Sequence, residues 1–371
     1  MNGRERIFIN ASTVLISGGL IISQNIINAL IQDDSFDIII TCPAYKPYRA
    51  YVTDNSKLIV VPHIMLNRIF RWYHDYFWLP AKIRRFNPTL VFTLSNLPAC
   101  TAYRQLYLHD NPYVTERDYS YIKIPAIDRI THYFRRILTL NRLKYVDHII
   151  VQTPYQKQAF SRIYKHEVPI SVLSPGIPEH LSARKSFNDK QLSKEYLKIA
   201  CVSRYFSHKN LEVLYETAKF CDIHNVSVQI ILTISPTENY HAKQLIKRIE
   251  KNSYNNRIIN IGRRKKKEIS DLISKVDALI LPSFLETYGL NCIEAWYHGK
   301  PIFVSDIESL RSSCGDAAFY FNPYSSESIV NTISNAFDNP DLISMKINSG
   351  KSRLKELHSW SDYVRLIQQV V

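Results

Sequence analysis

The stretch that most constrains the fold of this chain runs over residues 279–306, LILPSFLETYGLNCIEAWYHGKPIFVSD. It predicts a strand at Ala278–Leu281, a polar loop, a helix that begins near Tyr288, a turn at residues 299–301 and a second strand at Ile302–Val304. Two short apolar strands connected through a helix are the repeating unit of a parallel sheet. The stretch therefore predicts an α/β fold.

Two carboxylates flank the predicted helix start. Glu286 precedes the helix and Glu294 lies inside it. The first N–H groups of a helix have no partner within the helix and attract an anion such as phosphate. Ionised carboxylates only accept hydrogen bonds, so they suit a ligand that carries hydroxyls next to its phosphates. A nucleotide sugar has this chemistry.

The same block resembles the signature segment of the family 4 glycosyltransferases, retaining enzymes of the GT-B fold found in bacterial O-antigen, lipopolysaccharide and capsule synthesis. The matching residues are Pro282-Ser283, Glu286, Gly289-Leu290, Glu294-Ala295, Gly299-Lys300-Pro301 and Ser305. The family's usual Gly-Phe-Gly is Thr287-Tyr288-Gly289 here, which is a difference beside the donor sugar.

The resemblance implies roles for these residues. Glu286 would hold hydroxyls of the donor sugar, and Glu294 would hold the ribose. Backbone N–H groups at Tyr288, Gly289 and Leu290 would face the departing diphosphate. The leaving phosphate itself would accept the proton of the acceptor, so no nucleophilic carboxylate is required.

A chain of 371 residues, 46% of them hydrophobic, is long enough for two domains. Ser174–Pro178 holds two prolines and a glycine and predicts a linker. With the resemblance, the expected parts are an acceptor domain at 1–174, a donor domain at 175–356 and a terminal helix at 357–371 that returns to the first domain. Both domains are expected to be Rossmann-like and to face each other across a cleft.

The expected strands alternate with helical stretches, as in a doubly wound sheet. They are residues 7–13, Phe36–Thr41, Leu58–Pro62, Pro88–Ser95, Arg104–His109, Val168–Val172, Leu197–Ser203, Val226–Thr233, Arg257–Ile261 and the two strands of the opening block.

Two places in the first domain carry candidate donor contacts. Gly18 and Gly19 follow the first strand, ahead of a helix expected from about Leu20, and fit either a plain turn or a loop that approaches a ligand. His109 ends the Arg104–His109 strand and is either a satisfied loop residue or, by resemblance, a contact of the donor sugar.

The second domain opens with a strand followed by Arg204 and Lys209. Arginine can bind two phosphate oxygens at once and lysine adds a compact charge, so the pair suits a diphosphate. Their positions match the Arg-x4-Lys donor site of the family. Gly262 precedes the basic run Arg263–Lys267, which is either a solvated surface or, by resemblance, the loop beside the nucleotide base.

Two segments of the first domain, 63–86 and 119–145, are both basic and aromatic. In the first, Ile69, Trp72, Tyr73, Tyr76 and Phe77 fall at helical spacing, with Arg68 and Arg71 beside them. This face fits either a core or a membrane surface. Residues 1–173 hold 21 Lys+Arg against 12 Asp+Glu, an excess of nine in a total net charge of +14. That excess favours an anionic partner such as phospholipid or a lipid diphosphate.

Other classes are less well supported by the sequence. The amino terminus does not have the pattern of a signal peptide, and no run approaches the ~18 apolar residues of a membrane span. The six cysteines are scattered and predict reduced thiols of a cytoplasmic protein. The sequence lacks the Asp-x-Asp that holds a divalent ion in the other common glycosyltransferase fold, so neither metal nor cofactor is expected.

The predicted function is hexosyl transfer, with retention, from a nucleoside-diphosphate sugar to a hydroxyl of a lipid-linked surface glycan. The enzyme is expected in the cytoplasm, or on the cytoplasmic face of the inner membrane if the first domain binds lipid. Two alternatives remain: a nucleotide-sugar 2-epimerase of the same fold, and a basic nucleic-acid-binding protein, which has clustered charge but no recognisable motif.

Overall fold

The computed structural model describes residues 4–15, 17–67, 69–94, 97–116, 119–164, 168–181, 195–251, 254 and 256–370. The chain divides into two compact units. Unit 1 comprises Met1–Tyr119, Ile124–Pro178 and His358–Val371, and unit 2 comprises Ser120–Lys123 and Glu179–Leu357. The expected boundaries were 174/175 and 356/357.

Unit 1 is built on a parallel sheet that has seven strands among the described residues, in the order β3-β2-β1-β4-β5-β6-β7. The strands are β1 (Glu5–Asn10), β2 (Phe36–Cys42), β3 (Ser56–Val60), β4 (Leu90–Leu94), β5 (Gln105–Leu108), β6 (His148–Val151) and β7 (Ile170–Val172). The helices are α1 (Ser17–Ile31), α2 (Arg71–Tyr73), α3 (Leu79–Phe86), α4 (Pro112–Thr115), α5 (Ala126–Arg142), α6 (Pro154–Ile163) and α14 (Trp360–Val370).

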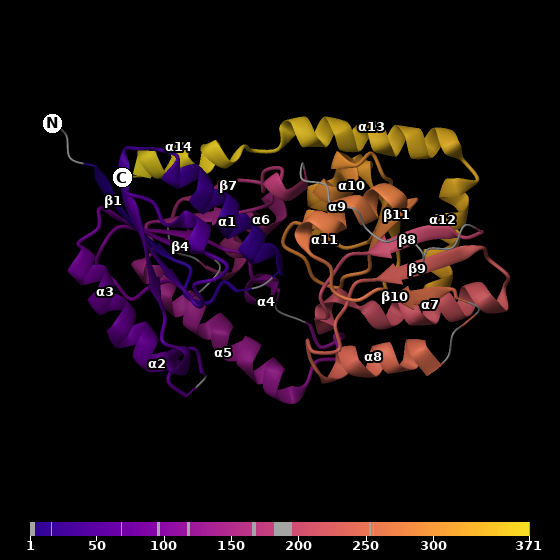
Figure 1. The fold of residues 1–371 in the computed structure, drawn as a ribbon, viewed down its shortest axis with the longest axis horizontal. Coiled ribbons are helices and arrows are strands. Elements are labelled where there is room, and N and C mark those ends of the chain that lie inside the picture. Colours follow the sequence, from indigo (N-terminus) through magenta and orange to yellow (C-terminus); the bar gives the residue numbers. More distant parts are fainter. Residues whose placement is uncertain are drawn as a thin grey trace. The chain divides into compact units, whose positions relative to one another are not determined.

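The last helix, α14, belongs to unit 1 and packs on α1 (Figure 1). Tyr363 donates its hydroxyl to the carbonyl of Leu173 at 2.9 Å, and the Trp360 indole N–H donates to the carbonyl of Ile177 at 3.0 Å. These bonds hold α14 against the end of the segment that precedes unit 2.

Unit 2 is a second parallel sheet, with six strands in the described part of the chain and the order β10-β9-β8-β11-β12-β13. The strands are β8 (Leu197–Cys201), β9 (Val228–Leu232), β10 (Ile258–Asn260), β11 (Ala278–Leu281), β12 (Ile302–Ser305) and β13 (Phe319–Phe321). The helices are α7 (Leu211–Ile223), α8 (Tyr240–Lys251), α9 (Lys266–Lys275), α10 (Leu290–Tyr297), α11 (Glu308–Cys314), α12 (Ser326–Phe337) and α13 (Pro340–Glu356).

Helices cover both faces of the unit 2 sheet. Ile199 of β8 packs in a cluster with α7, α8 and α12, whereas its neighbour Ala200 packs in a second cluster with α9, α10 and α11 (Figure 1). Successive strand residues point to opposite faces, so a strand that is buried on both sides is mostly apolar. That tendency explains the apolar runs from which the strands were predicted, and the α/β prediction is confirmed.

The structure corrects three local expectations. The strands β6 and β13 were not predicted, although predicted strands such as β5 and β10 are equally short. The helix α1 begins at Ser17, so Gly18 and Gly19 lie in its first turn and not in a loop. The helix α10 begins at Leu290 and not near Tyr288, since Gly289 at φ +86° is its N-cap.

The aromatic segment 63–86 is not a core helix. It consists of a short 3-10 turn, α2, a π-helical turn (His74–Trp78) and α3. The five residues of the predicted face are all exposed: Ile69, Trp72, Tyr73, Tyr76 and Phe77. The core alternative is therefore wrong. Arg68 lies outside the described residues. None of the described helices is both long enough and apolar enough to cross a membrane.

Candidate active site

The loop between β8 and α7 brings two predicted residues to the carboxyl edge of the unit 2 sheet. Lys209 ends a short 3-10 turn, and Asn210, in a left-handed conformation at φ 53°, starts α7. The Lys209 Nζ atom lies 2.5 Å from Oε1 of Glu286, which also accepts a 2.7 Å hydrogen bond from the Ser283 hydroxyl. A lysine and a glutamate 77 positions apart in the sequence thus form a single charged pair.

Arg204, at the start of the same loop, faces a carboxylate that sequence reasoning missed. Its Nε atom lies 3.5 Å from Oε1 of Glu238, whose side chain is only 3% exposed. Burial lowers the pKa of Arg204, Glu238 raises it and the positive charge of Arg263 lowers it. Arg263 is therefore close enough to add to the positive potential around Arg204. Glu238 lies beyond the end of β9, where only its strand-end position could have drawn attention to it.

Glu294 lies in the second turn of α10 and is nearly buried. Its Oε2 atom accepts a 2.9 Å hydrogen bond from the Asn291 amide, and its Oε1 atom lies 3.6 Å from Nε2 of His180. His180 belongs to the segment that opens unit 2 and was not predicted. Nothing in a single sequence links a histidine in a linker with a helical glutamate more than 100 residues away.

The start of α10 needs a glycine. Gly289 has φ +86°, and a Cβ atom there would lie 3.0 Å from Cδ2 of Leu310 and 3.2 Å from Cδ2 of Leu281. Both the conformation and the space exclude a larger residue. Tyr288, just before it, is buried in the apolar cluster under α10. Its side chain therefore anchors the loop, and only backbone groups at 288–290 are left to meet a ligand.

Gly262, after β10, also has a positive φ, +74°, but open space where a Cβ would lie. The side chain of Asn260 accepts from the backbone N–H groups of Gly262 at 3.3 Å and Ile234 at 3.1 Å, which ties the loops after β9 and β10 together. In the basic run that follows, Lys265 is the N-cap of α9 and its N–H donates to Glu268. The run is mostly exposed, in line with the solvated interpretation.

His109 is a predicted site residue of unit 1. His109 directly follows β5 and is fully buried, with its ring edge-on to Phe160 at 4.5 Å and its Nδ1 atom 3.2 Å from the Tyr107 hydroxyl. Burial lowers the pKa of His109 to about 3, so the imidazole is neutral at neutral pH. Its Nε2 atom has no hydrogen-bond partner among the described residues.

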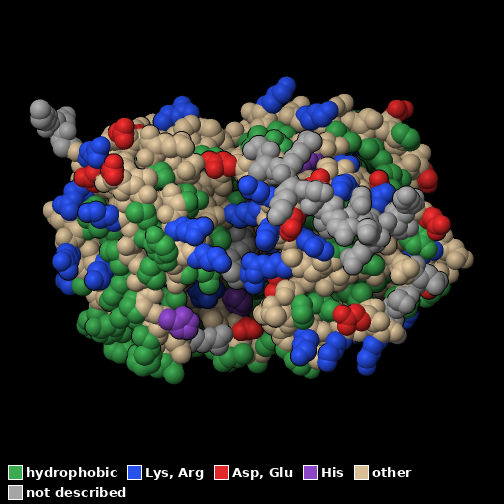
Figure 2. Space-filling view, viewed as in Figure 1, with side chains coloured by type: hydrophobic (Ala, Val, Ile, Leu, Met, Phe, Trp, Pro, Cys, Tyr) green, Lys and Arg blue, Asp and Glu red, His purple; other side chains and the backbone are tan. Residues whose placement is uncertain are grey.

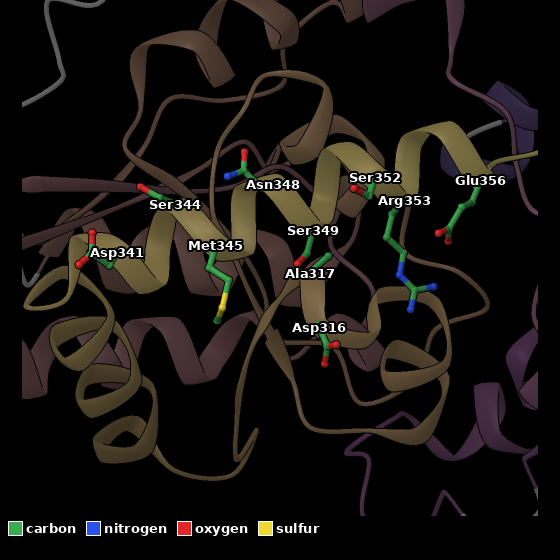
Figure 3. Close-up of a pocket in the computed structure, with 10 residues that line it drawn as sticks. All are labelled: Asp316, Ala317, Asp341, Ser344, Met345, Asn348, Ser349, Ser352, Arg353 and Glu356. Atoms are coloured by element: carbon green, nitrogen blue, oxygen red, sulfur yellow. The ribbon is translucent and has the colours of Figure 1, made fainter.

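A separate polar pocket of about 700 Å³ lies on unit 2 along α13 (Figure 3). None of the predicted site residues lines it. The lining residues are Asp316, Ala317, Asp341, Ser344, Met345, Asn348, Ser349, Ser352, Arg353 and Glu356. In the described part of the chain, no group of three or more His, Cys, Asp or Glu side chains is arranged to hold a metal ion.

The chain is similar in sequence to known glycosyltransferases. Residues 182–353 match the family described as "Glycosyl transferases group 1". The chain is 25% identical over 295 residues to the O-antigen chain mannosyltransferase RfbU of Salmonella typhimurium, covering 77% of this chain and 78% of that protein.

Two solved structures show the same fold. The glycosyltransferase WaaG, involved in lipopolysaccharide biosynthesis, matches with a TM-score of 0.70 at 14% identity, over 96% of both chains. Anabaena Alr3699/HepE in complex with UDP and glucose matches with a TM-score of 0.71 at 14% identity, over 99% of both chains. The predicted fold is thereby confirmed, and the match to transferases leaves the epimerase and nucleic-acid alternatives without support.

Proposed function

From the match of residues 182–353 to the group 1 glycosyltransferases and from the fold that the chain shares with WaaG, we propose that it transfers a hexose from a nucleoside-diphosphate sugar to a hydroxyl of a lipid-linked surface glycan, with retention and without a metal ion. The observation that carries the proposal is the Lys209–Glu286 pair at the carboxyl edge of the unit 2 sheet. It puts a cation for phosphate beside an acceptor for sugar hydroxyls, which is the chemistry of a nucleotide sugar.

Departure of the diphosphate is the step that needs positive charge. Negative charge grows on the leaving phosphate in the transition state, and cations placed in advance stabilise it more than they stabilise the substrate. Lys209 and Arg204 supply that charge in this proposal, with backbone N–H groups at the start of α10. The positive charges of Lys209 and Arg204 take the place that a divalent ion fills in metal-dependent transferases.

The carboxylates orient the donor. Glu286 accepts hydrogen bonds from sugar hydroxyls and Glu294 from the ribose, with Asn291 and His180 holding the Glu294 carboxylate in place. Gly262 gives the nucleotide base close access to the backbone. Gly18, Gly19 and His109 remain proposed donor contacts from unit 1, although the His109 side chain is fully buried in this structure. The acceptor oxygen replaces the diphosphate at the anomeric carbon, and its proton passes to the leaving phosphate.

The class of acceptor is proposed from the names of similar proteins. RfbU is named for an O-antigen chain and WaaG for lipopolysaccharide biosynthesis. These names support our proposal that the enzyme acts in the synthesis of an O-antigen, lipopolysaccharide or capsule glycan, and we propose that it works from the cytoplasm at the inner membrane.

A thermal-shift screen over UDP-, GDP- and dTDP-sugars tests the donor. A bound donor raises the melting temperature by mass action, so one base should give a larger shift than the others. The enzyme is then incubated with the nucleotide sugar that gives the largest shift and with a lipid-linked acceptor, in the presence and absence of EDTA. The anomeric configuration of the product is determined by NMR. A panel in which no nucleotide sugar raises the melting temperature contradicts the proposal. An inverted product or loss of transfer with EDTA contradicts the retaining or the metal-independent part alone.

A further inference from the structure

The segment 64–77 of unit 1 carries an unusual concentration of exposed apolar side chains. Each is between 43% and 69% exposed, and together they are called the aromatic surface: Ile64, Ile69, Phe70, Trp72, Tyr73, Tyr76 and Phe77. Figure 2 shows hydrophobic side chains gathered at the lower left of the molecule, over the region of α2 and α3. Soluble proteins rarely expose a contiguous patch of this kind without a partner for it.

The rings of the aromatic surface are ordered against one another. The Trp72 and Phe77 rings meet edge to face at 5.9 Å, and the Tyr73 and Phe77 rings stack at 5.7 Å. They pack among themselves and not into the core, so the patch is already formed before any partner arrives.

A buried ion cluster fixes the aromatic surface to the protein. Asp75, 4% exposed, accepts from Arg71 Nε at 2.9 Å and Arg142 Nη1 at 3.2 Å, and lies 2.7 Å from His74 Nδ1. Arg142, the last residue of α5, also lies over the Tyr76 ring at 4.9 Å. Breaking a buried pair of this kind is costly, so α5 and the aromatic surface keep one arrangement.

The helix α5 adds a second exposed apolar stripe. Ile127, Ile130 and Phe134 follow the i, i+3, i+7 spacing of one helix face, and with Tyr133 they are 51% to 58% exposed. An amphipathic helix normally buries such a face. Here the apolar side chains point to solvent in both segments, although they are held in place by buried charges.

The charge of the segment indicates the partner. Residues 63–86 contain five Lys or Arg but one acidic residue, Asp75, which is buried in the ion cluster. Arg84 and Arg85 are exposed in the last turn of α3, and Lys82 lies over the Trp78 ring. An interface with another protein does not require this excess of exposed Lys and Arg over acidic residues. A bilayer with anionic headgroups meets both features, since Trp and Tyr prefer the interface and Lys and Arg reach the phosphates.

We propose that the aromatic surface, together with the exposed stripe of α5 and the cations of α3, docks unit 1 reversibly on an anionic lipid bilayer. The rings enter the boundary between headgroups and acyl chains, and Arg84 and Arg85 pair with lipid phosphates. The inference rests on the proposed function only through the lipid-linked acceptor, because docking itself requires no catalysis.

The test uses the full chain with vesicles of phosphatidylglycerol and phosphatidylcholine, and with vesicles of phosphatidylcholine alone. We expect sedimentation with the anionic vesicles, a blue shift of tryptophan emission, and release as salt approaches 1 M, where the Debye length falls to about 3 Å. Arg84→Glu with Arg85→Glu should weaken binding by about tenfold or more, since each basic residue near the surface contributes about 1 kcal/mol. The matched control is Lys243→Glu with Lys247→Glu on α8 of unit 2, which should bind as the wild type does.

Trp72→Ala with Phe77→Ala should abolish the emission shift and reduce binding, and leave the melting temperature close to that of the wild type because both rings are exposed. Tyr240→Ala, another exposed aromatic residue, is its control. Failure to sediment at low salt overturns the proposal. So does concentration-dependent dimerisation that Trp72→Ala with Phe77→Ala removes, because the surface would then serve a second copy of the chain. Donor-induced thermal shifts in the same samples report on the proposed function separately.

Discussion

Lys209 and Glu286 form an ion pair in which Nζ lies 2.5 Å from Oε1, with side chains 19% and 8% exposed. Neither charge is fully solvated, and each is the other's main partner in the described part of the site. A ligand that offers phosphate to the lysine and hydroxyls to the glutamate replaces this pair with two new sets of contacts. The pair therefore keeps two partly buried charges compensated until a donor arrives.

Removing either cation should slow the reaction. Lys209→Ala and Arg204→Ala are each expected to lower kcat by about two orders of magnitude, the ~3 kcal/mol typical of one lost transition-state contact. Arg248→Ala is a matched control, because Arg248 forms an exposed ion pair with Glu216 on the same unit and should leave turnover unchanged. Steady-state kinetics of the three purified variants decide the matter, and normal turnover in Lys209→Ala would refute its role.

Neutralising Glu294 should lower the affinity of the protein for the nucleotide. In Glu294→Gln the side chain keeps its size but loses the charge that accepts ribose hydroxyls, so a nucleoside diphosphate should bind roughly tenfold more weakly, about 1.4 kcal/mol. Calorimetric titration with the nucleoside diphosphate alone measures this. Glu308→Gln, in the first turn of α11, provides the control. Equal affinity in the wild type and Glu294→Gln would rule out the ribose contact.

Two of the positive-φ glycines of unit 2, Gly262 and Gly289, should respond differently to alanine. At Gly262 the new methyl group has open space, so Gly262→Ala carries only the conformational cost of about 1 to 2 kcal/mol. Gly289→Ala adds contacts at 3.0 Å and 3.2 Å with two buried leucines and should destabilise unit 2 further. Chemical denaturation of both variants gives the difference. A Gly289→Ala protein no less stable than Gly262→Ala would contradict the described packing.

The buried His109 predicts a loss of stability in acid. Its pKa is lowered to about 3 in the folded protein, below the ordinary value of 6.5. Between these values the unfolded chain binds a proton that the folded chain does not, so stability is complete above about pH 6.5 and falls as the pH is lowered towards 3. Melting temperatures from pH 7 to 4.5 should therefore drop less in His109→Gln than in the wild type. His132, whose pKa burial lowers to about 4, contributes to both proteins and makes the comparison necessary. Parallel curves for the two proteins would contradict the assignment.

The sequence by itself was sufficient for the class of fold, and it supplied the residues of the donor block as candidates. Parallel strands buried on both faces are mostly apolar, so Ala278–Leu281 and the first three residues of Ile302–Ser305 stand out locally. Gly289 was singled out by the family resemblance, and the structure adds the reason, because only glycine tolerates its backbone angle and its surroundings. The strands β6 and β13 were missed, although β5 and β10, which are equally short, were predicted.

Only the tertiary structure decided which charges meet and which apolar faces stay outside. Glu238 beside Arg204 and His180 beside Glu294 are contacts between distant segments, and no local pattern encodes the folding that brings them together. The periodicity of residues 69–77 fits a buried helix and a docking surface equally well, because helical spacing describes a face and not what covers it. The exposure of Trp72 and the burial of Asp75 with Arg142 are properties of the folded unit, since they depend on how α5 packs against this segment.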